Sequence, residues 1–488
     1  MNITSYTYIV FLAVIAALYY IVPSKFQNLL LLAASYVFYM WAAPQNVAVL
    51  LATTAVTYGG AILMDNQKTT AKRRLICAVI AVVVLGVLVT FKYYNFSAEL
   101  LTGWGLAVTP MPLVSIAGLS FFTFQLVGYC IDVYRKNEKP EKNIIDFALF
   151  VSFFPQIISG PIGRAGELLP TYKTARNLEY ENIRQGVYRF LLGAFRKLVV
   201  ADGLAAYVDV VYGSLPKGSG LTIWITVVLY ALQIYFDFSG YTDIAVGAAR
   251  IFGIKLRENF FVPYLATSLG GFWSRWHMSL STWFRDYLYI PLGGNRKGFA
   301  AKLFNLLVVF VVSGLWHGAG VTFLLWGLWH GVFRMAEEIV LKIRKRKQFE
   351  FRTKLSRVFG VIVTNAIVFF GWVLFRASLM YQVSAVAKNL FVMSSPSETV
   401  DWIYTVMRSI SPNSIVYAKF AFALLVFSVL LAIALDIVMV KKTTGKEREY
   451  NPLLALKTPV RAAVCVIMVI CLLLIGKFGS SGFIYYTF

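Results

Sequence analysis

The chain has 488 residues, of which 59% are hydrophobic and only 14% are charged. Soluble globular proteins carry about 25% charged residues, so this composition excludes an ordinary soluble domain. Lys and Arg outnumber Asp and Glu by 46 to 23, which gives a formal net charge of +23. Because one membrane span takes about 20 residues, the length fits a single polytopic bundle of helices.

The basic residues do not form one soluble face, which argues against nucleic acid as a partner. They cluster after apolar segments, in the loops 65–74, 134–143, 335–357 and 441–457. Lys and Arg are enriched in loops on the cytoplasmic side of a membrane. With the N-terminus outside, all four loops fall on that side, where they also contact anionic lipid head groups.

Successive apolar segments predict an all-α fold with roughly 11–12 membrane-spanning helices. Helices are expected because each one satisfies its own backbone hydrogen bonds in lipid, whereas barrel strands would show short alternating patterns. The first segment has no basic region before it and no small-residue cleavage site after it, which favours a retained span over a signal peptide. The segments are 7–22, 29–43, 46–64, 75–92, 113–131, 187–212, 221–251, 303–316, 320–334, 358–376, 414–440 and 460–477.

One run does not fit the pattern of simple spans. Residues 144–161 are interrupted by Pro155, Gly160 and Pro161, and the following stretch 163–197 is again polar and basic. We expect the run to dip into the membrane and return, so that the basic stretch stays on the cytoplasmic side. Such a re-entrant segment is tolerated where other helices bury it.

The segment 254–300 is too long and too aromatic for a plain loop. Its Trp, Tyr and Arg content is typical of amphipathic helices at the membrane interface. Further on, the sequence SGLWHGAG at 313–320 joins two apolar runs at glycines, as in a helical hairpin. We treat 1–488 as one integral membrane domain, with a signature region at 254–334 and C-terminal spans at 358–488.

Familiar catalytic and metal-binding motifs are missing from the sequence. There is no GxSxG, no GxxxxGK[ST] and no HExxH, and the histidines have no acid nearby at metal-ligand spacing. We therefore expect no metal. The four cysteines each lie within an apolar stretch and form no CxxC pair, so we expect small core residues and no disulfide framework. They are Cys77, Cys130, Cys465 and Cys471.

The chain contains only three histidines, His277, His317 and His330. His317 lies between two apolar segments, where a polar side chain is costly and usually has a partner or a task. Its neighbours Gly318 and Gly320 allow a substrate or another backbone to come close. A histidine takes up a hydroxyl proton at neutral pH, so we predict that His317 is a general base. Taken alone, His277 is interpreted as an interfacial anchor, and His330 as a packing or hydrogen-bonding residue.

Intramembrane acids are the next scarce class. Gln233 and Asp237 lie four residues apart and share a helix face, whereas Asp243 points elsewhere. Asp237 is equally compatible with holding a substrate hydroxyl or orienting a histidine, and with a structural hydrogen bond. Broken helices and intramembrane acids are also features of transporters, so a carrier without chemistry remains the rival interpretation.

Two long strings resemble the membrane-bound O-acyltransferase family, specifically its bacterial branch typified by the alginate O-acetylation membrane protein. They are FWSRWHMSLSTWFRDYLYIPLGGNRKG at 272–298 and SGLWHGAGVTFLLWGLWHG at 313–331. A more distant similarity is to the teichoic acid D-alanyl transfer protein. Supporting similarity covers nearly the whole chain, in the segments 120–135, 150–164, 232–247 and 369–377.

The resemblance implies a helical bundle with re-entrant elements around a tunnel that crosses the membrane. It also implies that His317 is the essential histidine and that His277 is a second important polar position. Further residues are expected to contact substrate or line the tunnel: Asp237, Gln233, Arg275, Trp276, Ser279, Ser313 and Trp316.

By the same resemblance, we expect an acyltransferase in the bacterial cytoplasmic membrane. It would move an acyl group, with acetyl favoured, from a cytoplasmic thioester to a cell-surface polysaccharide or an extracytoplasmic partner enzyme. The donor, acetyl-CoA or an acyl carrier phosphopantetheine, is a substrate, and no cofactor is permanently bound. The partners are membrane lipid, the acceptor and an acyl carrier. Alternatives are D-alanyl transfer to teichoic acid, a glycan or lipid transporter, and a structural scaffold.

Overall fold

The computed structural model describes residues 1–42, 44–174, 176–214, 220–351, 353–392, 396–410, 414–442 and 450–479. These parts contain helices and loops and no strand, which confirms the all-α prediction. The α-helices are α1 (Tyr6–Ile21), α2 (Ser24–Ala42), α3 (Val47–Asp65), α4 (Thr70–Gly103), α5 (Leu119–Tyr134), α6 (Ile144–Ser152), α7 (Ala165–Tyr172), α8 (Tyr180–Ala194), α9 (Asp202–Ser214), α10 (Gly220–Ile251), α11 (Leu269–Trp273), α12 (Met278–Phe284), α13 (Phe299–His317), α14 (Val321–Ile343), α15 (Lys354–Arg376), α16 (Met380–Asn389), α17 (Pro396–Ile410), α18 (Ile415–Lys442) and α19 (Thr458–Ile475). Short 3₁₀ turns occupy Pro44–Asn46 and Pro263–Leu265, and π-helical turns occupy Phe195–Ala201 and Arg285–Tyr289.

Helices long and apolar enough to cross a membrane number seven within the described residues. They are Pro44–Asp65, Thr70–Gly103, Gly220–Ile251, Phe299–His317, Lys354–Arg376, Ile415–Lys442 and Thr458–Ile475, and α1 and α5 are shorter apolar helices. The chain is therefore a multi-pass helical membrane protein. The expected 11–12 spans and the tunnel stay predictions.

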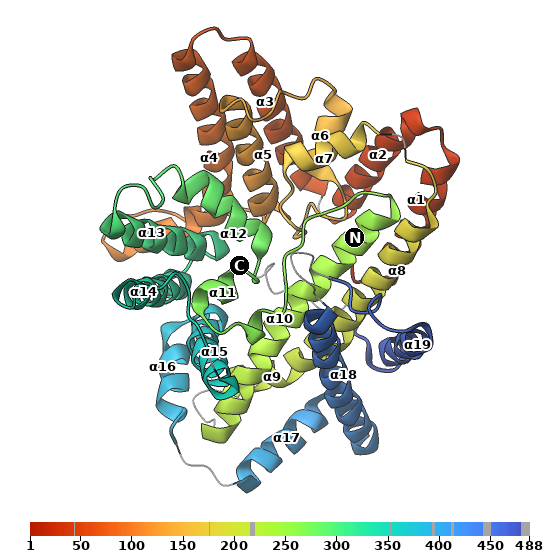
Figure 1. Cartoon of the computed structure of the whole chain (residues 1–488), viewed down its shortest axis with the longest axis vertical. Coiled ribbons are helices and arrows are strands. Elements are labelled where there is room, and N and C mark those ends of the chain that lie inside the picture. Colours follow the sequence, from red (N-terminus) through yellow and green to blue (C-terminus); the bar gives the residue numbers. More distant parts are fainter. Residues whose placement is uncertain are drawn as a thin grey trace. The chain divides into compact units, whose positions relative to one another are not determined.

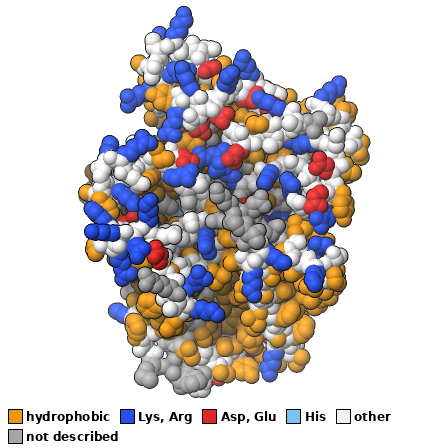
Figure 2. Space-filling view, in the orientation of Figure 1, with side chains coloured by type: hydrophobic (Ala, Val, Ile, Leu, Met, Phe, Trp, Pro, Cys, Tyr) orange, Lys and Arg blue, Asp and Glu red, His pale blue; other side chains and the backbone are white. Residues whose placement is uncertain are grey.

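The outer faces of these helices carry apolar side chains. On α15, for example, Leu355, Val358, Phe359 and Ile362 are all exposed. Figure 2 shows broad hydrophobic areas on the face in view, together with many more basic than acidic side chains. Large exposed apolar surfaces mark membrane contact, which is consistent with spans that face lipid.

Contacts divide the chain into two compact units. The first comprises Met1–Phe190, Thr242–Glu258 and Thr282–Tyr287. Within it α3, α4 and α5 run side by side (Figure 1). The run expected to be re-entrant contains only α6, whose nine residues span about 14 Å, followed by turns that are buried within this unit. Helix α6 alone is too short to cross a membrane, as expected, although its path relative to lipid stays a prediction.

The second unit comprises Leu191–Tyr241, Asn259–Ser281 and Leu288–Phe488. Its α13 and α14 form a tight antiparallel hairpin, and α15 packs beside α14 (Figure 1). The two helices of the hairpin approach closely because glycines lie where they touch. A Cβ on Gly314 would lie 2.3 Å from the Phe323 carbonyl oxygen, which only glycine avoids.

Two segments show detail beyond their sequence-based prediction. The apolar segment 187–212 is broken by the π-helical turn Phe195–Ala201, which carries two buried basic residues. The segment 254–300 forms short helices, as expected, but its Phe272, Trp276 and Trp283 are buried within their own units. These rings pack on other aromatic rings, and ring-on-ring burial removes apolar area from water. The expected position of this segment at the membrane interface stays a prediction.

Candidate active site

The second unit contains His317 at the C-terminal end of α13. Its side chain is only 5% exposed. The imidazole lies edge-on to three rings, with centroid distances of 4.9 Å to Trp316, 5.1 Å to Trp326 and 5.2 Å to Phe375. Gly318 then ends the helix in an extended conformation. The sequence had placed His317 in a hairpin junction, and the structure surrounds it with aromatic side chains from α13, α14 and α15.

His277 lies in the turn between α11 and α12 and has a positive φ of 44°. This left-handed conformation is uncommon for residues other than Gly, although Asn, Asp and His adopt it more often than the rest, and it concentrates at functional sites. Its carbonyl accepts the Ser281 N–H and so begins α12, while the Met278 N–H donates to the Asn259 carbonyl oxygen. The side chain is 2% exposed, and this burial lowers the pKa of His277 to about 3. His277 is therefore neutral at physiological pH.

The indole of Trp316 lies next to both of these histidines. Its centroid is 6.1 Å from the His277 ring and 4.9 Å from the His317 ring. On its other side, His277 meets the Phe238 ring edge-on at 4.6 Å. Residues 40 positions apart in the chain thus meet at one tryptophan. That His277 and His317 act together in catalysis stays a prediction.

The remaining residues of the turn hold His277 in place. Trp276 packs on Phe260 and Trp372, with centroids 5.1 and 4.7 Å away. The Ser279 hydroxyl donates to Asn259 Oδ1 at 2.6 Å. Arg275 lies over the Phe261 ring. All of these contacts are made to other protein side chains. The expectation that Arg275, Trp276 and Ser279 contact substrate stays a prediction.

The glycines beside His317 allow other parts of the protein to pack closely against the backbone. A Cβ on Gly318 would lie 2.2 Å from the Phe323 ring, so this glycine makes room for a side chain of α14. Gly320 has its nearest such atom at 3.5 Å. Ser313 is buried one turn before His317 on the same face of α13.

Asp237 forms an ion pair with Lys197, which the sequence analysis did not single out. Lys197 also bonds Asp202 at 2.8 Å, and all three side chains are buried. Gln233, one turn before Asp237, is buried as well, and its Oε1 has no hydrogen-bond partner within the described residues. Asp243 pairs instead with Arg189 in the first unit. Asp237 therefore has a structural partner, as one of the two interpretations expected.

Two buried basic residues, Arg196 and Lys197, were not among the predicted site residues, although the sequence indicates their importance. Arg196 and Lys197 interrupt an apolar run, where a charge requires a partner. Arg196 pairs with Asp436, which also accepts the Tyr235 hydroxyl at 2.8 Å. The π-helical turn presents both basic side chains to α10 and α18, and such turns recur at functional sites. No sequence pattern indicated that Asn259 would accept hydrogen bonds from Met278 and Ser279.

The third histidine borders the same aromatic cluster as His317, because both imidazole rings pack against Trp326. His330 is fully buried, and its ring is 4.9 Å from Trp273 and 5.1 Å from Trp326. Neither ring nitrogen has a hydrogen-bond partner within the described residues. His330 thus packs among rings, in line with the role expected from sequence.

Together these residues provide an imidazole for proton transfer and indole or imidazole N–H groups for hydrogen bonding, in an aromatic environment that excludes water. Such a site suits acyl transfer from an activated thioester, which needs a base and an oxyanion donor. Across the described ranges, no group of three or more His, Cys, Asp or Glu side chains is placed to hold a metal ion. The expectation of metal-free chemistry stays a prediction.

Comparisons with known proteins agree with this chemistry. A family model described as the membrane-bound O-acyltransferase family matches residues 142–381, which include all three histidines. The chain is 38% identical over 375 residues to the probable alginate O-acetylase AlgI of Pseudomonas aeruginosa, covering 75% of this chain and 70% of that protein. It is 31% identical over 437 residues to a peptidoglycan O-acetyltransferase of Helicobacter pylori, covering 82% and 79%.

A third relative is the teichoic acid D-alanyltransferase of Bacillus subtilis. It is 29% identical over 278 residues, covering 54% of this chain and 70% of that protein. The family match includes both histidines and the α13–α14 hairpin. The chain therefore belongs to the membrane-bound O-acyltransferase family and is a multi-pass membrane acyltransferase.

Proposed function

We propose that the protein moves an acetyl group from a cytoplasmic thioester to a hydroxyl of a cell-surface polysaccharide or of an extracytoplasmic partner enzyme. The observation that carries the proposal is the position of His317, which lies in an aromatic shell and shares Trp316 as a neighbour with His277. Water is excluded from such a shell, which protects the thioester from hydrolysis.

In this proposal His317 acts as the general base. It takes the proton of the acceptor hydroxyl while the hydroxyl oxygen attacks the thioester carbonyl carbon. The carbon–sulfur bond then breaks, the thiolate leaves, and the imidazolium returns the proton to sulfur. A positioned general base contributes about 10²–10⁴-fold in rate. The neutral His277 or the Trp316 indole supplies a hydrogen bond to the developing oxyanion.

The acetyl group is favoured by the names of two relatives, an alginate O-acetylase and a peptidoglycan O-acetyltransferase. A D-alanyl group is the alternative, supported by the lower-coverage relative that acts on teichoic acid. The transporter interpretation was motivated by Asp237, Gln233 and the broken helices, and the ion pair with Lys197 gives Asp237 a structural task.

The donor is proposed to be acetyl-CoA or an acyl carrier phosphopantetheine, with no permanently bound cofactor and no metal. The loops with excess Lys and Arg lie on the cytoplasmic side of the bacterial inner membrane in this proposal, as the distribution of positive charge favours. Both donors are anionic, so a basic face attracts either one. Membrane lipid, the acyl carrier and the extracytoplasmic acceptor are the proposed partners.

The test is acyl transfer by purified protein in lipid nanodiscs. Radiolabelled acetyl-CoA, acetyl carrier protein or D-alanyl carrier protein is offered with alginate, peptidoglycan or teichoic acid as the acceptor. We expect label transfer from an acetyl donor, and H317A should lower it about 10²-fold or more. H330Q is the matched histidine control and should keep the rate per folded molecule. Full activity of folded H317A would overturn the catalytic assignment, and transfer from the D-alanyl donor alone would overturn the acetyl assignment.

A further inference from the structure

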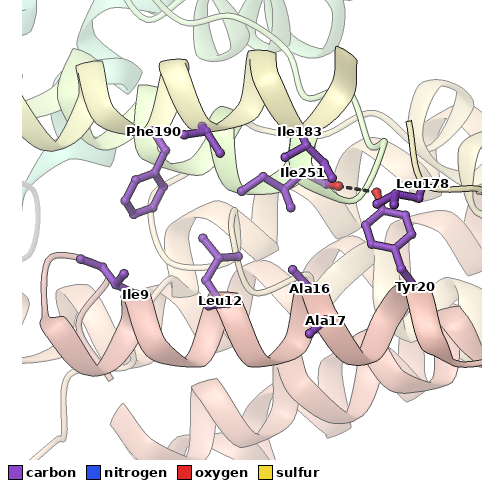
Figure 3. Close-up of a pocket in the computed structure, with 11 residues that line it drawn as sticks. Ile9, Leu12, Ala16, Ala17, Tyr20, Leu178, Ile183, Phe190 and Ile251 are labelled. Atoms are coloured by element: carbon purple, nitrogen blue, oxygen red, sulfur yellow. Dashed lines mark hydrogen bonds between the residues drawn. The ribbon is translucent and has the colours of Figure 1, made fainter. Parts of the chain in front are cut away.

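An apolar groove opens in the first unit between α1 and α8 (Figure 3). Its volume is about 460 Å³, and no charged side chain lines it. Helix α1 lines one wall from Ile9 to Tyr20, and α8 lines the other with Ile183, Val187 and Phe190. Val187 and Ile9 are exposed, so the groove is open on the apolar outer surface.

Small residues keep the groove from closing. Ala13, Ala16 and Ala17 lie on the α1 wall, where larger side chains would fill the space. From Ile9 to Tyr20 the chain advances eleven residues, or about 16 Å along a helix. The hydrocarbon core of a bilayer is about 30 Å thick, so one leaflet accounts for about 15 Å. The groove is thus as long as the hydrocarbon part of one leaflet.

The two ends of the groove differ in charge. Residues 1–24 contain no charged side chain, so the wall near Ile9 has none nearby on α1. At the other end the Tyr20 hydroxyl donates to the Ile251 carbonyl oxygen. A tyrosine hydroxyl at the end of an apolar stretch is typical of the membrane–water interface.

Two arginines lie beside that polar end. Arg250 directly precedes Ile251, and the Arg176 guanidinium lies 5.7 Å from the Tyr19 ring centroid. A Cβ built on Gly253 would lie 3.6 Å from Cδ of Arg176, which places Arg176 next to the end of α10. Throughout the described part of the first unit, neither arginine forms an ion pair with a carboxylate. Nη1 of Arg176 donates to the Thr171 carbonyl oxygen and Nη2 donates to Asn28 Oδ1, whereas the Nε atoms of both arginines are buried without a hydrogen-bond partner there.

We propose that the groove binds one acyl chain of an anionic glycerophospholipid from the surrounding leaflet, with its phosphate next to Arg176 and Arg250. The chain covers the apolar walls, and the phosphate oxygens accept hydrogen bonds from the guanidinium groups, which are suited to phosphate. Guanidinium groups that form no ion pair within the described part of this unit, at one end of an apolar groove, fit an amphiphile with an anionic head.

The test compares lipids that co-purify with the protein. Wild type is reconstituted in vesicles of equal phosphatidylcholine and phosphatidylglycerol, extracted in detergent, and examined by native mass spectrometry. We expect phosphatidylglycerol to be retained in preference. One basic residue near an anionic head group is worth about a fivefold change, so R176Q and R250Q should each reduce the preference by that factor.

Filling the groove tests the chain site separately. A16F should abolish retention of the bound lipid, whereas V14F, at a position on α1 that is 51% exposed and outside the groove, should leave it unchanged. If A16F does not fold, A16L is the smaller replacement and should lower retention. Equal retention by V14F and a folded groove-filling variant would overturn the site, and equal retention of the two lipids by wild type would overturn the head-group assignment.

Discussion

A Cβ atom built on Gly371 of α15 would lie 2.3 Å from Nε2 of His330 on α14. The imidazole therefore packs directly on a bare stretch of helix backbone, and the rings of Trp273 and Trp326 lie against its other sides. Protein interiors are packed as densely as organic crystals, so no side chain can be added here without moving the histidine.

G371A should therefore destabilise the packing of α14 on α15 by about 1–3 kcal/mol, the usual cost of overfilling a core. The measurement is thermal unfolding of the purified protein in detergent. G86A is the matched control, because a Cβ at Gly86 of α4 meets nothing within 4 Å. There the change from Gly to Ala within a helix should stabilise by about 0.5–1 kcal/mol.

The double variant G371A/H330A separates a clash with His330 from a general helix effect. Its loss of stability should be smaller than the sum of the two single losses, since the alanine at 371 then occupies space that the imidazole leaves. Strict additivity would show that His330 and Gly371 do not pack on each other.

His277 gives a prediction about backbone strain, because its φ of 44° disfavours most side chains. Asn adopts this conformation more readily, so H277N should unfold at a temperature equal to or above that of H277A. If the imidazole donates to the oxyanion, the rate per folded molecule should nevertheless fall about 10²-fold in H277N. A folded H277N with the wild-type rate at saturating donor would show that His277 only begins α12.

The pH dependence of stability follows from the burial of His277. Its pKa is about 3 in the folded chain and about 6.5 when unfolded, so the unfolded chain takes up its proton first. The stability of wild type relative to H277N should thus be constant above about pH 6.5 and should fall as the pH drops below it. Unfolding midpoints of both proteins from pH 4 to 8 measure this, and parallel curves throughout would contradict it.

Lys197 holds two buried carboxylates, Asp202 and Asp237, in one network. K197M should cost about 3–5 kcal/mol, because it leaves buried negative charge without its cation. D237N should cost less, since Lys197 keeps Asp202. Unfolding and activity are measured on the same preparations. We expect the folded fraction of D237N to transfer acyl groups at the wild-type rate, and a folded but inactive D237N would instead place Asp237 in contact with substrate.

The thiols of Cys77 on α4 and Cys130 on α5 lie close together, with their sulfur atoms 3.5 Å apart. A small approach of the helices allows a disulfide, whose sulfur–sulfur bond is about 2.05 Å. Treatment with a mild thiol oxidant should remove two free thiols per chain without forming a dimer, as seen by intact mass and thiol labelling. C77S should keep the Cys130 thiol reduced, and loss of labelling at Cys130 in that variant would point to another partner.

The pattern of apolar segments was sufficient to identify an all-helical membrane protein, because lipid leaves few other ways to pair the backbone. It also located most helix positions, such as α10, α13 and α15, within a few residues. It did not predict the break at Phe195–Ala201. The basic residues of that turn pair with Asp202, Asp237 and Asp436, and the last two lie far from the turn in sequence.

The candidate site divides in the same way. The scarcity of histidine and its place between apolar runs singled out His317 from sequence alone, since a polar group in such surroundings needs a reason. Only the tertiary structure decided that His277 meets the same Trp316, and that His330 packs on Gly371. Contacts of this kind depend on how helices pack and on a left-handed turn, and the hydrophobic periodicity of the sequence predicts neither of them. The charge of +23 followed from composition, whereas the arginines left without a carboxylate beside the α1 groove emerged only when distant segments came together.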